Sequence, residues 1–427
     1  MDTAAGIIVL KLSSKLNTRF NQNVFYNSLG SFTYIFFQYL LTVVILRVKG
    51  AEDAGVYSLA YTFTNIFATI ATFGMGNYQI SDVMGRHTDG TYIATRVCTS
   101  AAALVCFFIT LFFTGFPRGT LVCCAVLMLY RLLEGLSGVY LCVLQKFEDY
   151  KTISVSYCIK GGLTFLTFCA TLYFFELQQA IFAMSAAFLP VFLLFDIPRA
   201  VHSAGFTAKA VKRDIANILF PSFVLVLQSL SYFCMTFFTR YIIEKTYSTK
   251  ELGYFSSITL IMLVLPLLTG PALSVLIPGF SGLYAQKRYA VIRRMTFRAC
   301  VCVAVVTAAL CASSLLWGRF ALRLLFGEEI LQYSFLLMPT LLAGGFLLGC
   351  GMLAGILTAM RRHGSLLTAG IAAALTVVLC CPALVRRFYM GGAIYSLIIA
   401  YTVQGIITMA VIIRNIKDVS AVTDNEI

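Results

Sequence analysis

Charged residues are scarce in this chain, and their scarcity argues against a soluble domain. Of its 427 residues, 12% are Asp, Glu, Lys or Arg and 59% are hydrophobic. A soluble domain carries about 25% charged residues. Trp (1) and His (3) are also rare, whereas Phe (36) and Tyr (22) are abundant. This balance is typical of a chain that is embedded in lipid.

Long polar segments are missing too, and apolar runs take their place. A bilayer core about 30 Å thick needs about 20 apolar residues for each helical span. We therefore predict an all-α polytopic membrane protein with about 12 transmembrane helices. The runs lie near 24–46, 54–76, 97–116, 119–143, 153–174, 178–197, 215–239, 252–280, 298–317, 332–360, 366–385 and 389–413.

Basic residues set the expected orientation. Lys and Arg (32) outnumber Asp and Glu (18), and they concentrate in "RAVHSAGFTAKAVKR" (199–213) and "QKRYAVIRRMTFR" (286–298). Because loops rich in Lys and Arg stay in the cytoplasm, both segments and both termini are predicted to be cytoplasmic. The net charge of +14 then reflects topology and attraction to membrane lipids. No basic domain lies outside the membrane, so nucleic acid is not an expected partner.

The chain divides into two halves at its longest polar linker. We expect a cytoplasmic surface segment at 1–22, a six-helix lobe at 23–200, a linker at 201–214, a second six-helix lobe at 215–414 and a cytoplasmic tail at 415–427. "DAGVYS" (53–58) is repeated as "ELGYFS" (251–256), and "YIATR" (92–96) as "YAVIR" (289–293). Chance is the alternative, since Gly and aromatic residues are common at helix ends. An even number of spans per half predicts parallel repeats that rock around a shared cavity, as in transporters.

Signatures of other protein classes are absent from the sequence. No cleavable signal peptide is expected. No Gly-rich loop with Lys-Ser/Thr appears, so ATP is not the expected direct driver. The 14 cysteines fall almost wholly in spans, and neither disulfides nor a metal site nor a cofactor is expected. His87, His202 and His363 lie in predicted inside loops. A membrane enzyme such as a polymerase or acyltransferase is disfavoured, because no loop offers positioned acid–base groups.

Charged residues inside the spans are the main functional signal. An ionised side chain at mid-membrane costs about 2.5–3.5 kcal/mol on insertion scales. Arg131 and Glu134 lie three residues apart on one helix and can pair. Glu134, the one clear acid inside a span, and Lys160 are predicted about 16 Å and about 13 Å above the inner surface. Glu134 is therefore expected between Arg131 and Lys160, in a net positive cluster that would hold a phosphate.

Simpler interpretations of this cluster and of other polar residues stay open. Arg131 and Glu134 also fit a structural clip between helices, and Lys160 a side chain that reaches toward the inner surface. Interhelical hydrogen bonding explains single polar residues in a span as well as a cavity does. The further candidates for lining a cavity are Asn27, Gln38, Asn65, Gln228, Arg240 and Gln404.

Several segments resemble one family. "GVYSLA" (55–60), "FGMGNYQISD" (73–82) and "YRLLEGLSGVYLCVLQKFEDY" (130–150) resemble signatures of bacterial polysaccharide flippases. These belong to the multidrug/oligosaccharidyl-lipid/polysaccharide exporter superfamily, which has a MATE/MOP-like transporter fold. The family often shows Arg before Gly in the following span, where this chain has Lys160–Gly161. The resemblance implies two lobes, alternating access and a lipid-linked oligosaccharide as cargo.

The sequence therefore predicts a flippase and not an enzyme. It would move a polyprenyl-pyrophosphate-linked oligosaccharide from the inner to the outer leaflet, for surface polysaccharide synthesis. Arg131, Lys160 and Glu134 would bind the anionic headgroup. The expected location is the bacterial inner membrane, with polysaccharide polymerases or glycosyltransferases as partners. The alternative is a cation-coupled exporter of drugs or metabolites on the same fold, which would need buried acids.

Overall fold

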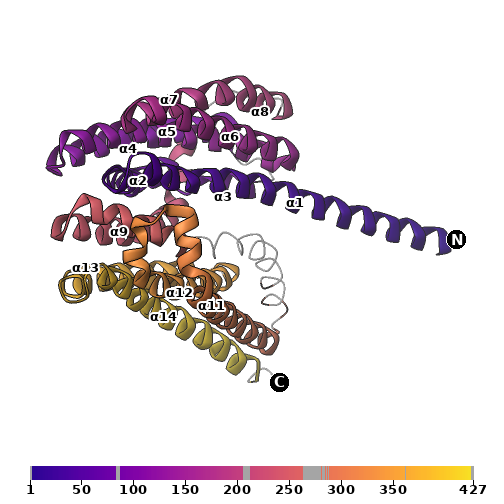
Figure 1. Ribbon diagram of the computed structural model, residues 1–427. Helices are drawn as coiled ribbons and strands as arrows, with labels where there is room; N and C mark the ends of the chain where they lie inside the picture. The colour runs from indigo at the N-terminus through magenta and orange to yellow at the C-terminus, as the bar shows by residue number, and fades with distance from the viewer. Residues whose placement is uncertain are drawn as a thin grey trace. The chain divides into compact units, whose positions relative to one another are not determined.

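The computed structural model describes residues 2–82, 87–204, 212–262, 280, 284, 286, 288–360 and 362–424. Within these ranges all regular secondary structure is helical (Figure 1). The helices up to the central linker are α1 (Asp2–Val48), α2 (Ala51–Thr72), α3 (Met75–Ser81), α4 (Asp89–Phe113), α5 (Arg118–Lys146), α6 (Tyr150–Phe174), α7 (Leu177–Val191), the π-helical η1 (Phe192–Asp196) and α8 (Ile197–Ala204).

The second half is also helical throughout its described part. It contains α9 (Lys212–Thr246), a helical segment at 249–262, α11 (Tyr289–Phe326), the 3₁₀ segment η2 (Glu329–Leu336), α12 (Leu337–Ala359), α13 (His363–Phe388) and α14 (Met390–Asp424). Helix α14 packs against both α12 and α13.

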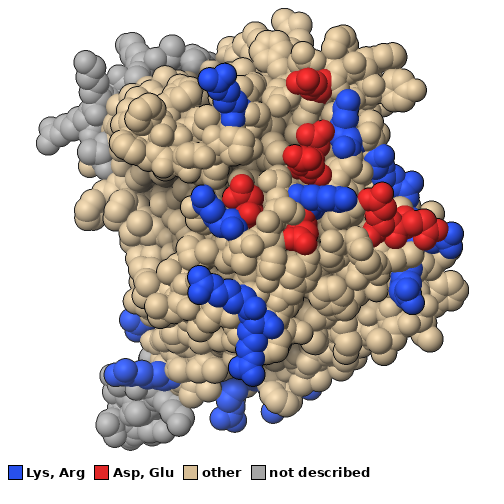
Figure 2. Space-filling model, turned by 60° about the vertical axis from the view of Figure 1, so that its left-hand side comes forward, with Lys and Arg blue, Asp and Glu red and all other residues tan. Residues whose placement is uncertain are grey.

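Ten helices of the described chain are long and apolar enough to cross a membrane. They match ten of the twelve predicted runs. Helix α2 is not among the ten, and the predicted run 252–280 is described only to residue 262 and at residue 280. Large apolar side chains such as Phe112 (84% exposed) and Leu316 (82%) project outward, and Figure 2 shows wide uncharged areas between charged side chains. Exposed apolar surface of this extent is stable in hydrocarbon.

Helices extend beyond several of the predicted runs. Helix α4 begins at Asp89 and α11 at Tyr289, eight or nine residues before the apolar runs that predicted them. "YIATR", expected in the loop before the third span, therefore lies inside α4. Its Arg96 is only 3% exposed and donates to the Ala71 carbonyl at the end of α2 (3.4 Å). Basic side chains near a helix C-terminus satisfy carbonyls that lack helical partners.

The chain packs as two compact units. The first comprises residues 1–41, 71–106 and 126–221, and the second comprises 42–70, 107–125 and 222–427. The first unit therefore lacks the C-terminal end of α1 and most of α2, which pack in the second. The lobes predicted at 23–200 and 215–414 stay a prediction.

The two copies of the repeated sequence pattern are in contact inside the second unit. Segments 51–58 and 249–256 contact each other, and Ser58 donates to the Ser256 hydroxyl (2.6 Å) across a separation of 198 residues. Both serines are buried. The two segments that the repeat relates are thus also neighbours in space.

Two glycines let these segments approach closely. A Cβ atom on Gly55 would overlap the Thr249 backbone, and one on Gly253 would overlap the Ala51 backbone. The two contacts are related by the same repeat, because Ala51 corresponds to Thr249 and Gly55 to Gly253. Small residues permit backbone contact between membrane helices.

Gly253→Ala is expected to destabilise the protein by about 1–3 kcal/mol, since the added methyl group has no space to enter. The measurement is thermal unfolding of the purified variant in detergent. Gly162→Ala is the matched control, because a Cβ atom on Gly162 meets nothing within 4 Å. Equal melting temperatures for the two variants would show that the close contact at 253 contributes nothing.

Candidate functional site

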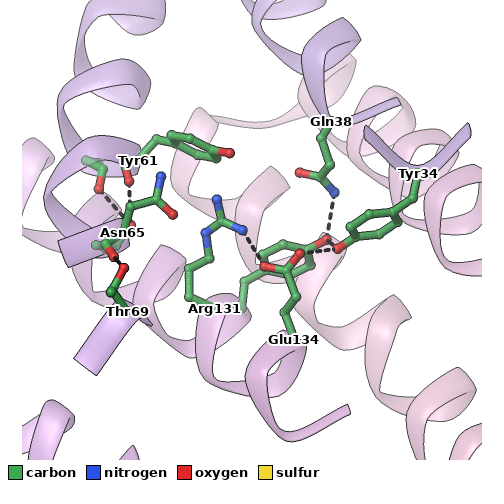
Figure 3. A network of polar contacts seen from close by, with 10 residues as sticks. Tyr34, Gln38, Tyr61, Asn65, Thr69, Arg131 and Glu134 are labelled. Atoms are coloured by element: carbon green, nitrogen blue, oxygen red, sulfur yellow. Dashed lines mark hydrogen bonds and ion pairs between the residues drawn. The ribbon is translucent and has the colours of Figure 1, made fainter. Parts of the chain in front are cut away.

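Arg131 and Glu134 form an ion pair on α5. The Arg131 Nη1 atom donates to Glu134 Oε2, as their three-residue spacing predicts (Figure 3). The Arg131 side chain is 10% exposed and the Glu134 side chain 27%. A charged pair this far from water is stable only with further hydrogen bonds to its polar atoms.

A chain of hydrogen bonds supplies this support to Glu134. Tyr34 on α1 donates to Glu134 Oε1 (2.7 Å), and its oxygen lies 2.8 Å from the Tyr130 hydroxyl. Gln38 donates to that Tyr130 hydroxyl (2.7 Å). Because the single proton of Tyr34 is used toward Glu134, Tyr130 must donate to Tyr34. All three groups therefore orient their donors toward the carboxylate (Figure 3). Gln38 thus makes an interhelical hydrogen bond.

Lys160 on α6 has a different partner from the predicted one. Its ammonium group forms an ion pair with Asp196 in η1, and the two side chains are 1% and 0% exposed. Ser137 (2.7 Å) and Ser156 (2.6 Å) also donate to the Asp196 carboxylate, and Lys160 donates to Ser137. The Lys160 nitrogen lies 5.0 Å from the Phe188 ring centroid. Asp196 is fully satisfied at a depth where an unpaired carboxylate would be very costly.

Two expectations for this region are therefore wrong. Glu134 is not the only acid inside a span, and the cluster is not net positive, because Asp196 balances Lys160 as Glu134 balances Arg131. Asp196 follows Pro190 and lies in a π-helical turn, a local rearrangement that is frequent at functional sites. The available signal was one acid in the apolar stretch "LPVFLLFDIP".

A small cavity in the first unit is lined by one member of each ion pair. Its volume is about 140 Å³, and Tyr34, Glu134, Tyr157, Lys160 and Phe188 are among the residues that line it. The structure therefore brings Glu134 and Lys160 to one cavity although they do not pair. A cavity with several polar partners can hold water or a polar ligand group.

Arg240 on α9 is a half-buried cation in the second unit. Its Nε atom donates to Ser58 Oγ (2.9 Å), and Nη1 donates to the Thr236 carbonyl (3.2 Å). No carboxylate among the described residues forms an ion pair with it. Its electrostatic neighbours in the second unit are hydroxyl groups, those of Tyr61, Tyr232 and Tyr401. An uncompensated guanidinium inside a span favours an anion.

The remaining candidates for lining a cavity do not all lie in one site. Gln228 on α9 and Gln404 on α14 line one cavity of about 260 Å³ in the second unit. Asn65 on α2 is buried, and its backbone carbonyl accepts from Thr69 (2.8 Å). Asn27 is half-buried on α1. Across the described ranges, no three His, Cys, Asp or Glu residues gather as ligands for a metal ion.

Comparison with known proteins gives a family match. A family described as "Polysaccharide biosynthesis protein" matches residues 20–284. The capsular polysaccharide biosynthesis protein CapF of Staphylococcus aureus is 22% identical over 310 residues, which cover 70% of this chain and 76% of CapF.

Solved structures share the fold. A multidrug resistance MATE family transporter of the MOP superfamily, in an inward-facing conformation, aligns with a TM-score of 0.71 and 14% identity, covering 92% of this chain and 96% of that chain. The lipid II flippase MurJ, in an inward closed conformation, aligns with a TM-score of 0.69 and 11% identity, covering 92% and 90%. At these identities the likeness establishes the fold.

Proposed function

This chain belongs to the family of polysaccharide biosynthesis proteins, and we propose that it is a flippase for a lipid-linked oligosaccharide. The cargo would be a polyprenyl-pyrophosphate carrier bearing a short glycan. It would pass from the inner to the outer leaflet by alternating access of two six-helix lobes. Such carriers are anionic at the headgroup, neutral at the sugars and apolar at the tail, so a flippase needs a contact for each part.

Arg240 carries the argument for an anionic cargo. Its side chain lacks a carboxylate partner among the described residues and so keeps its full charge for a ligand. Arg131 in the first unit is a separate candidate for binding phosphate, because its guanidinium fork can bind a phosphate beside Glu134. Lys160 is already neutralised by Asp196, and we assign it to holding α5, α6 and η1 together.

The cellular setting follows from the same proposal. The protein would lie in the bacterial inner membrane with both termini in the cytoplasm, in agreement with the concentration of Lys and Arg in the predicted inside segments. Glycosyltransferases would supply its cargo on the inner leaflet, and a polysaccharide polymerase would use it on the outer leaflet.

A cation-coupled exporter is the second candidate. It is favoured by one observation, the presence of two carboxylates inside spans of the first unit, the partly exposed Glu134 and the buried Asp196. Exporters of cations use such acids. Each of these acids already has a basic partner, however, and Arg240 would repel a cation from the second unit.

Deletion of the gene and analysis of lipid-linked intermediates test the proposal. We expect polyprenyl-linked oligosaccharide to accumulate on the inner leaflet and surface polysaccharide to be lost. A deletion strain with normal glycans and altered drug sensitivity would instead support the exporter.

Arg240→Gln is expected to slow transport about 10- to 100-fold, the loss that follows from removing one charge-assisted hydrogen bond. Membrane abundance should be normal, since the change removes a charge from a span. The rate is measured as clearance of the accumulated intermediate in the complemented deletion strain. Arg47→Gln is the control. Arg47 is exposed and donates to α11 carbonyls, including that of Leu325 (2.8 Å). Equal rates for the two variants would remove Arg240 from the site.

A further inference from the structure

The cavity of about 260 Å³ in the second unit has a neutral polar lining. It lies among α9, α12, α13 and α14, and none of the described residues that line it is charged. Its volume is about nine times the ~30 Å³ that one water occupies in the liquid. It therefore has room for a ring-sized polar group, and its lining does not select for either sign of charge.

Three polar groups in this lining lack protein partners. Among the described residues, the side-chain amides of Gln228 and Gln404 and the Tyr232 hydroxyl form no hydrogen bond with the protein. The two amides therefore do not bridge helices, unlike Gln38, whose amide donates to Tyr130. An unsatisfied amide in hydrocarbon is costly. These groups must find their partners inside the cavity.

We propose that this cavity is a carbohydrate subsite that binds a neutral sugar unit of the cargo. Amide groups offer both a donor and an acceptor, the combination that suits adjacent sugar hydroxyls. The Tyr232 and Phe233 rings, 5.3 Å apart between centroids, offer apolar surface to the C–H face of a sugar ring. The proposal rests on the flippase function proposed above and assigns the glycan to a place separate from the phosphate.

The position of Arg240 is consistent with this assignment. Tyr232 and Arg240 lie eight residues apart on α9, about 12 Å along the helix axis and about 80° around it, and their side chains are electrostatic neighbours. A headgroup bound at Arg240 would thus leave its sugars near the cavity that Tyr232 lines. The charged and neutral parts of one ligand would meet chemically matched parts of one helix.

The test replaces both amides with the isosteric thioether in Gln228→Met/Gln404→Met. This double variant removes the polar groups but keeps volume, and it eases membrane insertion because it removes two polar groups from the spans. Its melting temperature should therefore be equal to or higher than that of the wild type. In the complemented deletion strain we expect clearance of the lipid-linked oligosaccharide to slow about tenfold. Gln178→Met in α7, a residue that is not in the lining of the cavity, is the matched control and should clear it normally.

A binding measurement separates the sugar from the phosphate. Farnesyl pyrophosphate carries the anion and a prenyl chain without a sugar, and we expect it to bind the double variant and the wild type equally. Weaker binding of this probe by the double variant would overturn the subsite, as would normal transport or a lowered melting temperature. If the deletion strain accumulates no lipid-linked oligosaccharide at all, the flippase function itself fails, and the subsite fails with it.

Discussion

Lys160→Met is expected to destabilise the protein by about 3–5 kcal/mol, because it leaves Asp196 buried without a counter-ion. The Asp196 side chain is 0% exposed, so bulk water does not solvate the carboxylate that is left. Ser137 and Ser156 would still donate to the carboxylate, but neither brings a positive charge. The measurement is unfolding of the purified variant in detergent, together with its abundance in the membrane.

The double variant Lys160→Met/Asp196→Leu separates structure from transport. Replacing a whole buried ion pair by apolar side chains is often neutral or stabilising by about 1–4 kcal/mol. Stability should therefore return, and transport should return with it if Lys160 only holds the helices together. A double variant that is stable and correctly inserted but inactive would contradict that assignment and return Lys160 to the headgroup site.

Exchanging the charges in Arg131→Glu/Glu134→Arg is expected to slow transport about 10- to 100-fold, because it moves the guanidinium away from the position where it can meet a phosphate. The exchange keeps an oppositely charged pair three residues apart on α5. A structural clip between the two residues would therefore survive it. Transport is measured as clearance of accumulated lipid-linked oligosaccharide, with abundance checked in the same membranes.

A single variant at position 131 separates the two interpretations less well than the exchanged pair does. Arg131→Ala also leaves Glu134 without its cation, so a loss of activity in that variant mixes two effects. In the exchanged pair both charges remain, although Tyr34 would then face a guanidinium where it now donates to Glu134. Adding Tyr34→Phe to the exchanged pair removes this conflict. The Tyr34→Phe single variant is then the reference for that triple variant. Normal transport by the exchanged pair would support the structural clip.

The helical architecture was predictable because hydrocarbon imposes a length on each span. Ten helices match predicted runs, although the ends were less well predicted. Helix α11 starts at Tyr289, because helical hydrogen bonding continues through polar residues beyond the apolar part. Apolar runs report where lipid lies, whereas helix ends depend on capping and on contacts with other segments.

The candidate site was predictable only where its partners are close in sequence. Arg131 and Glu134 pair because one helix turn relates them. Ser137 donates to Asp196 across 59 residues, a contact that depends on how α5 packs against η1. The π-helical turn after Pro190 also places Asp196 at a position that regular helical spacing does not give. An acid within an apolar stretch marked Asp196 as unusual, but the sequence did not indicate that Lys160 is its partner.

Single polar residues in the spans could be identified as candidates for lining a cavity, but the sequence did not show which of them lie together. Gln38, Gln228 and Gln404 look alike in sequence, yet Gln38 donates to Tyr130 and the other two line one cavity. Packing of helices that are distant in sequence decides which amide is satisfied by protein. The repeated "DAGVYS" and "ELGYFS" segments were found in sequence, but their direct contact required the structure.

Reconstitution into liposomes tests the central claim most directly. The purified protein would be placed in vesicles that contain a polyprenyl-pyrophosphate-linked oligosaccharide, and the movement of glycan between leaflets would be followed with an externally added lectin. The account predicts movement by the wild type that slows about 10- to 100-fold in Arg240→Gln, with no transport of a cationic dye by either protein. Dye transport without glycan movement would contradict it.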